Sequence, residues 1–270
     1  MRPLAVGLLL AVGAGAAAAG EPAPVDRYPR AAAAYLVTVN GRVLWARAAD
    51  SPRAPASLTK IMTALLALEG NWSPEAWVPV SPRAARATGS RLGLRAGEQL
   101  AAADALLAVL VSSANDACLA LAEQAGGTVE GFVERMNRRA AEMGLRATHF
   151  ENPCGNDAPG HRSSPRDLLR LAQAALRLPE FRRMVGVERA QVTTRGGRAL
   201  ELRTGNALLG RLEGATGVKS GYTPGAGRCL VALAERDGNE VLLVLLDARD
   251  RWWTAAGLVE AAFEEVPRRG

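Results

Sequence analysis

The pattern of hydrophobic and polar positions changes twice along the chain. Two short β-prone runs, 34–39 and 42–46, are joined by Asn40-Gly41, a dipeptide typical of tight β-hairpins. Apolar residues recur at the spacing of three and four that is typical of helices in a segment that starts near residue 57, and a central block from about residue 101 to residue 178 is mostly helical in pattern. Beyond residue 185 the strand pattern returns, and the runs 228–234 and 240–246 flank a turn at 237–239.

The central block is predicted to be mostly helical. We expect a helix that starts near Ser57, and a last helix over 252–265. The clearest helices between these two are 102–111, 114–124, 129–143 and 165–176. Because strands at both ends enclose a helical middle, the two terminal hairpins are expected to share one antiparallel sheet, with the last helix covering a face. The predicted fold class is therefore α/β (α+β) with a mostly helical middle subdomain.

The N-terminus has the features of a secretory signal. Arg2 is followed by an apolar stretch, and the small residues 17–19 suit cleavage by signal peptidase. An uncleaved membrane anchor is the alternative, but the leucine-rich part is short for a membrane span. We therefore expect a signal peptide over 1–19, a Pro-rich charged linker over 20–30 and one domain over 31–270. The protein is expected to be exported to the periplasm or the cell wall.

Composition excludes several classes of function. The net charge of +6 comes from scattered arginines and only 4% of the residues are aromatic, so no nucleic-acid footprint is present. The basic balance suits a negatively charged polymer such as a cell wall. The two histidines, His149 and His161, lack the spacing of zinc ligands, and no Gly-x-Ser-x-Gly elbow accompanies them.

Three cysteines are too few and too widely spaced for a disulfide scaffold. Cys118 lies in an apolar helical run and Cys229 in an apolar strand, where cysteine acts as a small hydrophobic residue. We predict structural roles for both and for Cys154, while the odd count leaves room for a free thiol.

The scarcity of lysine is the strongest indication of a catalytic site in this sequence. Of 33 lysines and arginines only two are lysines, Lys60 and Lys219. Arginine keeps its proton at any reachable pH, whereas the pKa of lysine moves with burial and neighbouring charge. A group that must exchange a proton near neutral pH can therefore be a lysine and not an arginine. Both lysines lie in serine-containing motifs, 57–60 and 219–221, which indicates a serine nucleophile activated by an amine.

Ser57 and Lys60 form the first motif. Residues three apart on a helix share a face, with their Cβ atoms about 5–6 Å apart. A lysine there can remove the serine proton if burial or a second cation lowers its pKa. The alternative is that Ser57 caps a helix and Lys60 is a solvated charge.

The second lysine begins the motif Lys219-Ser220-Gly221, which precedes an apolar strand. Lys219 can hold a positive charge near the nucleophile, and the Ser220 hydroxyl can bind a carboxylate. Small residues at Ser220 and Gly221 let a substrate backbone pair with a strand edge. Taken alone, the motif is better explained as a surface turn before an edge strand.

Ser113-Ala114-Asn115 lies between two predicted helices, where side chains can project into a cleft. Ser113 is a candidate proton relay, and Asn115 can hold Lys60 or a substrate amide. Capping of the following helix is the alternative. Ser112 competes with Ser113 for the register, but only Ser113 has an asparagine two residues later.

Together these motifs form the order Ser-x-x-Lys, Ser-x-Asn, Lys-(Thr/Ser)-Gly of serine acyltransferases. The chain resembles the low-molecular-mass penicillin-binding proteins of the D-alanyl-D-alanine carboxypeptidase family over essentially all of residues 30–265. The segments 56–64, 113–118, 152–161 and 216–223 carry the resemblance. Ser220 stands where threonine is usual, and this exchange keeps the hydroxyl group.

The resemblance implies a β-lactamase/transpeptidase-like fold and a D,D-peptidase reaction. Ser57 attacks the carbonyl between two D-alanines of a peptidoglycan stem peptide, with Lys60 as base. The backbone N–H groups of Ser57 and Tyr222 hold the oxyanion, and β-lactams acylate Ser57. No metal or cofactor is implied. Many members add a C-terminal β-domain and an amphipathic membrane anchor, and we expect neither within 31–270.

Three alternatives stay open. A D,D-endopeptidase cleaves cross-links instead of the terminal D-alanine. A class A serine β-lactamase needs a deacylating glutamate, for which Glu151 is the nearest candidate. A catalytically silent wall-binding protein keeps the fold but has no need of both lysines.

Overall fold

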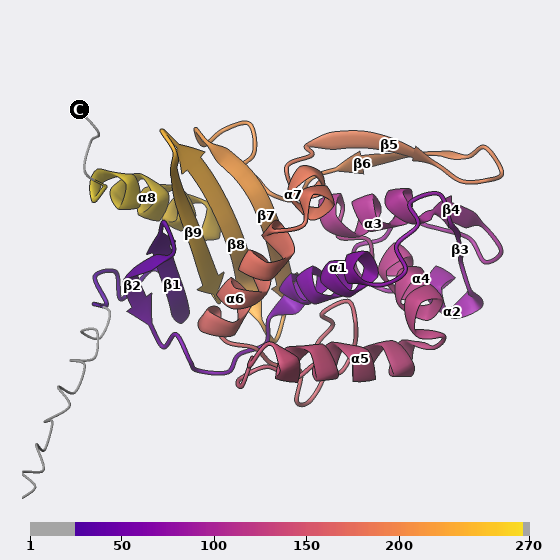
Figure 1. Cartoon of the computed structure of the whole chain (residues 1–270), viewed down its shortest axis with the longest axis horizontal. Helices are drawn as coiled ribbons and strands as arrows, with labels where there is room; N and C mark the ends of the chain where they lie inside the picture. Colours follow the sequence, from indigo (N-terminus) through magenta and orange to yellow (C-terminus); the bar gives the residue numbers. More distant parts are fainter. Residues whose placement is uncertain (1–24, 267–270) are drawn as a thin grey trace, which may run out of the picture.

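Strands from the two ends of the chain form one five-stranded antiparallel sheet, which confirms the predicted fold class (Figure 1). The computed structural model describes residues 25–266, so the predicted signal peptide and the first part of the linker lie outside the described residues. The strand order is β2-β1-β9-β8-β7. The strands are β1 (Ala34–Val39), β2 (Arg42–Arg47), β7 (Ala215–Thr223), β8 (Gly227–Arg236) and β9 (Asn239–Leu246).

Both faces of this sheet are covered. Alternate residues of β9 divide between the two hydrophobic clusters, with Leu242 and Val244 packed on the helical side and Leu243 packed on the opposite side. The second side is covered by α8 (Arg251–Glu264), as predicted. Burial on both faces explains why β9 reads as a continuous apolar run instead of an alternating one.

The helical middle follows the predicted order closely. The helices over 102–111, 115–126, 129–142 and 165–176 begin and end within about two residues of the predicted positions, because apolar residues recur along them at helical spacing. The helices of this part are α1 (Lys60–Glu69), α2 (Pro82–Ala85), α3 (Ala102–Val111), α4 (Asn115–Gly126), α5 (Val129–Glu142), α6 (Pro165–Leu176) and α7 (Pro179–Val185). A 3₁₀ turn, η1 (Ala56–Thr59), leads directly into α1.

Two small sheets and the position of one motif depart from expectation. The two-stranded sheet of β3 (Trp77–Pro79) and β4 (Gln99–Ala101), and the hairpin of β5 (Arg189–Thr193) and β6 (Ala199–Arg203), were not predicted. The Lys219-Ser220-Gly221 motif was expected before a strand, but it lies inside β7 and pairs with β8. The glycine-rich approach has little strand propensity, and only pairing with β8 makes it a strand. Since β7 is the edge of the sheet, one side of its backbone faces away from the other strands.

Cys118 and Cys154 have a structural role, as predicted, but the sequence did not predict that they pair with each other. They form a disulfide, while Cys229 is a buried free thiol. The two are 36 positions apart in sequence, but the chain returns after α5 and brings their Cα atoms to 6.0 Å, within the usual range for a disulfide.

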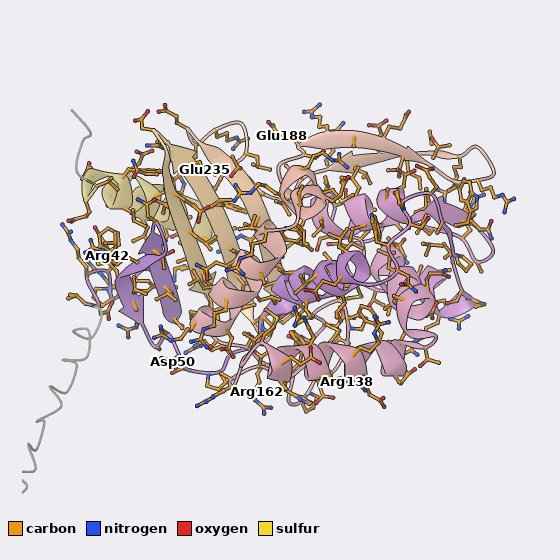
Figure 2. The ribbon with its side chains drawn as sticks, in the orientation of Figure 1. Arg42, Asp50, Arg138, Arg162, Glu188 and Glu235 are labelled. Carbon is orange, nitrogen blue, oxygen red and sulfur yellow. A yellow bond between two sulfur atoms is a disulfide. The ribbon has the colours of Figure 1, made fainter. Side chains whose placement is uncertain are left out.

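Charged side chains are spread over the surface. The six residues labelled in Figure 2, among them Arg42, Arg138 and Arg162, are spread over different strands, helices and loops and are all exposed. Among the helices of residues 25–266, none combines the length and the hydrophobicity needed to cross a membrane.

Candidate active site

Ser57 and Lys60 lie at the junction between η1 and α1. Ser57 is the second residue of the 3₁₀ turn, and Lys60 is the first residue of the α-helix. Neither the turn nor the helix is capped by the Ser57 side chain, because Pro55 and Thr59 occupy the two cap positions. The capping alternative for Ser57 is therefore excluded.

The two lysines are buried, unlike every arginine in the part of the chain that the structure describes. Lys60 is 0% exposed and Lys219 is 3% exposed. Burial lowers the pKa of Lys60 well below its ordinary value, and the positive charge of Lys219 lowers it further. The lowered pKa favours the neutral amine of Lys60, which is the form that can act as a base.

Three oxygen atoms surround the Lys60 amine. Its Nζ lies 3.1 Å from Ser57 Oγ, 2.7 Å from Asn115 Oδ1 and 2.6 Å from the carbonyl oxygen of Cys154. A neutral amine has two N–H bonds and one lone pair. When the amide and carbonyl oxygens, which can only accept, take the two hydrogens, the lone pair is left for the Ser57 hydroxyl. The geometry therefore suits transfer of the serine proton to Lys60.

Asn115 is fixed by a loop that precedes α3. Its backbone N–H donates to Ser90 O at 2.7 Å, and its Nδ2 donates to Thr88 O at 2.6 Å. These contacts determine which end of the amide points to Lys60, so that Oδ1 is the atom that accepts from the amine.

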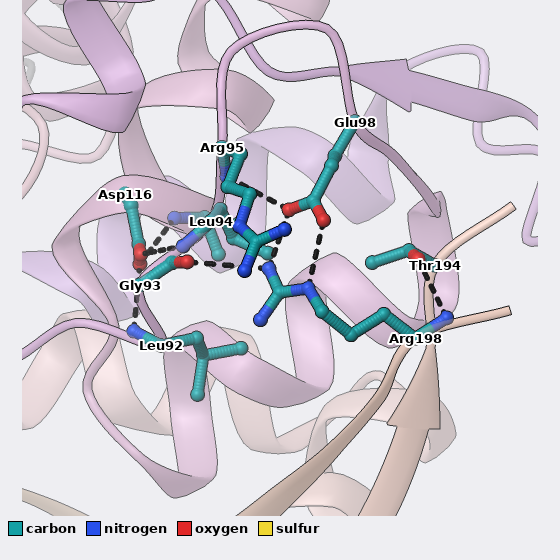
Figure 3. A network of polar contacts seen from close by, with 9 residues as sticks. Leu92, Gly93, Leu94, Arg95, Glu98, Asp116, Thr194 and Arg198 are labelled. Atoms are coloured by element: carbon teal, nitrogen blue, oxygen red, sulfur yellow. Dashed lines mark hydrogen bonds and ion pairs between the residues drawn. The ribbon is translucent and has the colours of Figure 1, made fainter. Parts of the chain in front are cut away.

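A polar network in turn holds this loop (Figure 3). The Asp116 carboxylate accepts from the backbone N–H groups of Leu92 and Leu94, at 3.2 and 3.0 Å. Arg198, in the β5–β6 hairpin, donates to Glu98 through Nε at 2.7 Å and through Nη2 at 2.5 Å. The hairpin, the loop and the start of α4 are thereby tied together beside Asn115.

Ser113 and Ser112, the two serines that could belong to the Ser-x-Asn motif, differ in the hydrogen bonds of their hydroxyl groups. The Ser112 hydroxyl donates to Arg203 O at 3.3 Å and accepts from Arg203 N at 3.1 Å, so this serine is tied to β6. Ser113 is half-buried between α3 and α4 with a φ of +56°, and its hydroxyl has no hydrogen-bond partner among the described residues. Hydrogen bonds thus join Ser57, Lys60 and Asn115, whereas the Ser113 hydroxyl makes no hydrogen bond to any of these three residues.

The third motif lies along the edge strand next to Ser57. Lys219 Nζ donates to Ser220 O at 2.8 Å. Burial lowers the pKa of Lys219 to about 7, and the positive charge of Arg251 contributes to the shift. Ser220 Oγ donates to Gly205 O at 3.2 Å, while the Tyr222 side chain is 62% exposed.

The loop that carries Cys154 was not predicted as part of the site. Asn152 Oδ1 accepts from the backbone N–H groups of Cys154 and Gly155, at 3.2 and 2.7 Å. Gly155 has a φ of +85°, and a Cβ there would lie 1.9 Å from Ala56 O, so only glycine fits. The Asn-Pro-Cys-Gly sequence signals such an asparagine turn, but nothing in it marks the Cys154 carbonyl as a ligand of Lys60.

His161 fastens the far end of this loop to η1. Its Nδ1 accepts from Glu151 N at 3.0 Å, so the proton of the neutral ring is on Nε2, which lies 2.8 Å from Thr59 Oγ1. Burial lowers the pKa of His161 to about 4, which keeps the ring neutral at physiological pH. Across residues 25–266, no three His, Cys, Asp or Glu side chains gather in a way that could hold a metal ion.

Comparison with known proteins gives a consistent result. A family profile described as D-alanyl-D-alanine carboxypeptidase matches residues 22–250. The D-alanyl-D-alanine carboxypeptidase DacF of Bacillus subtilis is 34% identical over 212 residues, which are 77% of this chain and 54% of that protein. A D-alanyl-D-alanine carboxypeptidase of Streptomyces sp. K15 is 32% identical over 262 residues, covering 90% of this chain and 89% of the relative. The chain therefore spans about half of DacF and most of the Streptomyces protein.

Solved structures agree with these sequence matches. The crystal structure of the Streptomyces K15 DD-transpeptidase superimposes with a TM-score of 0.82 at 30% identity, over 87% of this chain and 97% of that one. The DacD carboxypeptidase of Francisella tularensis gives a TM-score of 0.79 at 26% identity, over 86% of this chain and 70% of that one. The resemblance predicted from the three motifs is confirmed.

Proposed function

Because this chain belongs to the D-alanyl-D-alanine carboxypeptidase family, we propose that it is a serine D,D-carboxypeptidase acting on peptidoglycan stem peptides that end in D-Ala-D-Ala. The observation that carries this proposal is the buried Lys60 amine, 3.1 Å from Ser57 Oγ and held by two further oxygens. Arrangements of this kind activate a serine for acyl transfer.

In the proposed reaction, Ser57 Oγ attacks the carbonyl between the two D-alanines while its proton passes to Lys60 Nζ. The new bond joins Oγ to the carbonyl carbon, and the carbonyl oxygen becomes an oxyanion. Backbone N–H groups of Ser57 and Tyr222 hold this oxyanion. Collapse breaks the C–N bond, and the proton on Lys60 reaches the leaving amine through the Ser113 hydroxyl. Water then hydrolyses the ester and restores Ser57.

The edge strand β7 supplies the substrate platform in this proposal. Its outward backbone side can pair with an extended peptide, as in strand addition at a sheet edge. Ser220 offers a hydroxyl and Lys219 a buried amine for the substrate carboxylate. The exposed Tyr222 ring borders the same edge. β-Lactams are the expected covalent inhibitors, because they present a strained amide to the same serine.

The proposed place of action is outside the cytoplasm. Residues 1–19 have the composition of a cleavable export signal, and the proposed substrate is a polymer of the cell wall. We propose a periplasmic or wall-associated enzyme. Intact-mass measurement of the protein secreted by its host, compared with the mass expected after removal of 1–19, tests this location.

A product assay decides between the reactions open to this site. The purified protein is incubated with a stem pentapeptide, with a cross-linked dimer, and with the pentapeptide plus an acceptor amine, and the products are resolved by mass. Free D-alanine from the pentapeptide, with the dimer intact, is expected. Cleavage of the dimer alone would establish an endopeptidase.

The incubation with an acceptor amine tests for the activity after which the Streptomyces structure is named, that of a DD-transpeptidase. A new amide bond between donor and acceptor, formed faster than hydrolysis, would assign transfer as the main reaction. A Ser57→Ala variant, which keeps the fold but lacks the nucleophile, serves as the blank in all three arms. Product release by that variant would contradict the role of Ser57.

A further inference from the structure

The Cys118–Cys154 disulfide lies directly behind the proposed base. Cys118 is in α4 and Cys154 is in the loop after α5, and the two residues are 0% and 2% exposed. Solvent therefore does not reach the bond, and its position is unusual for a disulfide that only staples a surface loop.

Each half of the disulfide is attached to one of the two acceptors of Lys60. Asn115, whose Oδ1 lies 2.7 Å from Nζ, is three residues before Cys118 in the same helix. The other acceptor, at 2.6 Å, is the carbonyl oxygen of Cys154 itself. The Cys154 sulfur also lies 3.8 Å from the Asn115 carbonyl oxygen. The disulfide and the Lys60 amine thus connect the same two parts of the chain, the start of α4 and the loop that carries Cys154.

Other contacts of the loop do not duplicate this tie. Thr63 Oγ1 donates to Pro153 O at 2.6 Å, which fixes the loop to α1. Asn152 Oδ1 orders the loop internally. Between the loop and Asn115, the side-chain contact from Nδ2 to Asn156 Oδ1 is long, at 3.4 Å. Without the disulfide, nothing covalent and little else would fix the Cys154 carbonyl relative to α4.

We propose that the Cys118–Cys154 disulfide is a positioning element of the active site, which fixes the two acceptors that orient the Lys60 amine toward Ser57. Cys118 and Cys154 act through Lys60 and do not touch the reacting atoms. This inference rests on the proposed function, in which Lys60 is the base. Loss of the bond lets the two acceptors separate, so that the lone pair is directed at Ser57 for a smaller fraction of the time.

A second consequence concerns hydration. If α4 and the loop separate, water gains access to the amine, and the burial that favours its neutral form is reduced. The proton affinity of Lys60 then rises, and the acidic limb of the acylation rate moves to higher pH. A role in stability alone predicts no such movement, so the pH profile separates the two roles.

The test begins with the protein as it is. Peptide mapping by mass spectrometry without reductant is expected to find Cys118 joined to Cys154. The second-order rate of acylation by a fluorescent penicillin is then measured from pH 5 to pH 9, beside the melting temperature, for wild type, Cys118→Ala/Cys154→Ala and Cys229→Ala. The last is the matched control, because it removes a buried thiol that is not in the disulfide.

We expect the double variant to acylate about 10- to 100-fold more slowly at pH 7, the range expected for small errors in positioning. Its acidic limb is expected at higher pH than that of wild type and Cys229→Ala. If the double variant does not fold, wild type is unfolded in denaturant, reduced by dithiothreitol and refolded without oxidant, because solvent does not reach the bond in the folded protein. Two electrons from the dithiol convert the disulfide into two thiols, which are counted by alkylation of a denatured portion. The acylation rate and its pH profile are measured on the reduced protein without alkylation, and reoxidation of that protein is expected to restore the wild-type rate.

A folded protein without the bond that keeps the wild-type rate and pH profile would overturn the inference, even if it melts earlier. Active wild type in which both residues are free thiols would overturn it too. If the oxidised wild type is not acylated and releases no D-alanine, the proposed function itself fails, and this inference fails with it.

Discussion

Gly221 in β7 approaches Ser57 so closely that a Cβ atom added to the glycine would lie 2.8 Å from the Ser57 backbone nitrogen and 2.9 Å from Ala56 Cβ. The atoms in the way belong to the backbone and to a short side chain, which cannot rotate aside. The absence of a side chain at Gly221 therefore sets how near the edge strand lies to the nucleophile.

Gly221→Ala is expected to push β7 away from η1 and to misplace the substrate relative to Ser57. We expect the acylation rate with a labelled penicillin to fall at least about 100-fold, because small displacements at a reacting centre have effects of this size. Gly257→Ala is the matched control. Nothing lies within 4 Å of a Cβ at Gly257, which is in α8, so this exchange is expected to stabilise the helix by about 1 kcal/mol. A wild-type acylation rate in Gly221→Ala would show that β7 does not have to stay close to Ser57.

Lys60→Arg tests the identity of the base. Arginine keeps the positive charge but does not release its proton, so it cannot accept the proton of Ser57. Acylation is expected to drop by at least about 1,000-fold. Circular dichroism shows whether the fold survives, since the larger guanidinium has to fit where Lys60 is 0% exposed. Normal acylation by a folded Lys60→Arg protein would remove Lys60 from the role of base.

Lys219 is expected to act through its charge. Its positive charge lowers the pKa of Lys60, so Lys219→Gln should raise that pKa toward the ordinary value. Because the base must be neutral, a higher pKa moves the acidic limb of the acylation rate to higher pH. Lys219→Arg keeps the charge, so its limb is expected to stay near that of wild type while its rate falls. Acylation rates from pH 5 to pH 9 measure both effects, and an unmoved limb in Lys219→Gln would contradict the coupling.

The parts of the fold with a strong hydrophobic pattern were predictable, and the parts without one were not. The stripe of α6 and the continuous apolar run of β9 each bury most of their length, so periodicity revealed them. Each strand of the β5–β6 hairpin has a single fully buried residue out of five, Val192 in β5 and Leu202 in β6. Such strands are formed by pairing with each other, and a single sequence has no signal for that.

The same distinction applies to the candidate site. Ser57 and Lys60 could be found because their side chains carry the chemistry at helical spacing, and the rarity of lysine marked them. The Cys154 carbonyl is backbone, so its residue type says nothing of its contact with Lys60. The disulfide depends on the return of the chain after α5, which brings together residues 36 positions apart. Only the tertiary structure contains that information.

His161 should make the stability of the fold depend on pH. Its pKa is lowered from 6.5 to about 4, chiefly because the ring is buried. Between these values the unfolded chain binds a proton that the folded protein does not, so folding is favoured by higher pH in this window. Its contribution is complete above about pH 6.5 and is lost as the pH falls toward 4. At pH 5 the loss is about 2 kcal/mol relative to neutral pH.

Denaturant unfolding at pH 7.5, 6 and 5 measures this effect, with His161→Gln beside wild type. Glutamine does not titrate, so the variant is expected to be less stable than wild type at pH 7.5 because it loses the fit to Thr59 and Glu151. The difference should shrink as the pH is lowered, since only wild type has a buried ring to protonate. His149→Gln removes the other histidine of the chain, which contributes electrostatically to the lowered pKa of His161, so the stability of this variant should fall slightly less than that of wild type between pH 7.5 and pH 5. A constant difference between wild type and His161→Gln across this range would mean that the ring does not stay neutral in the folded protein.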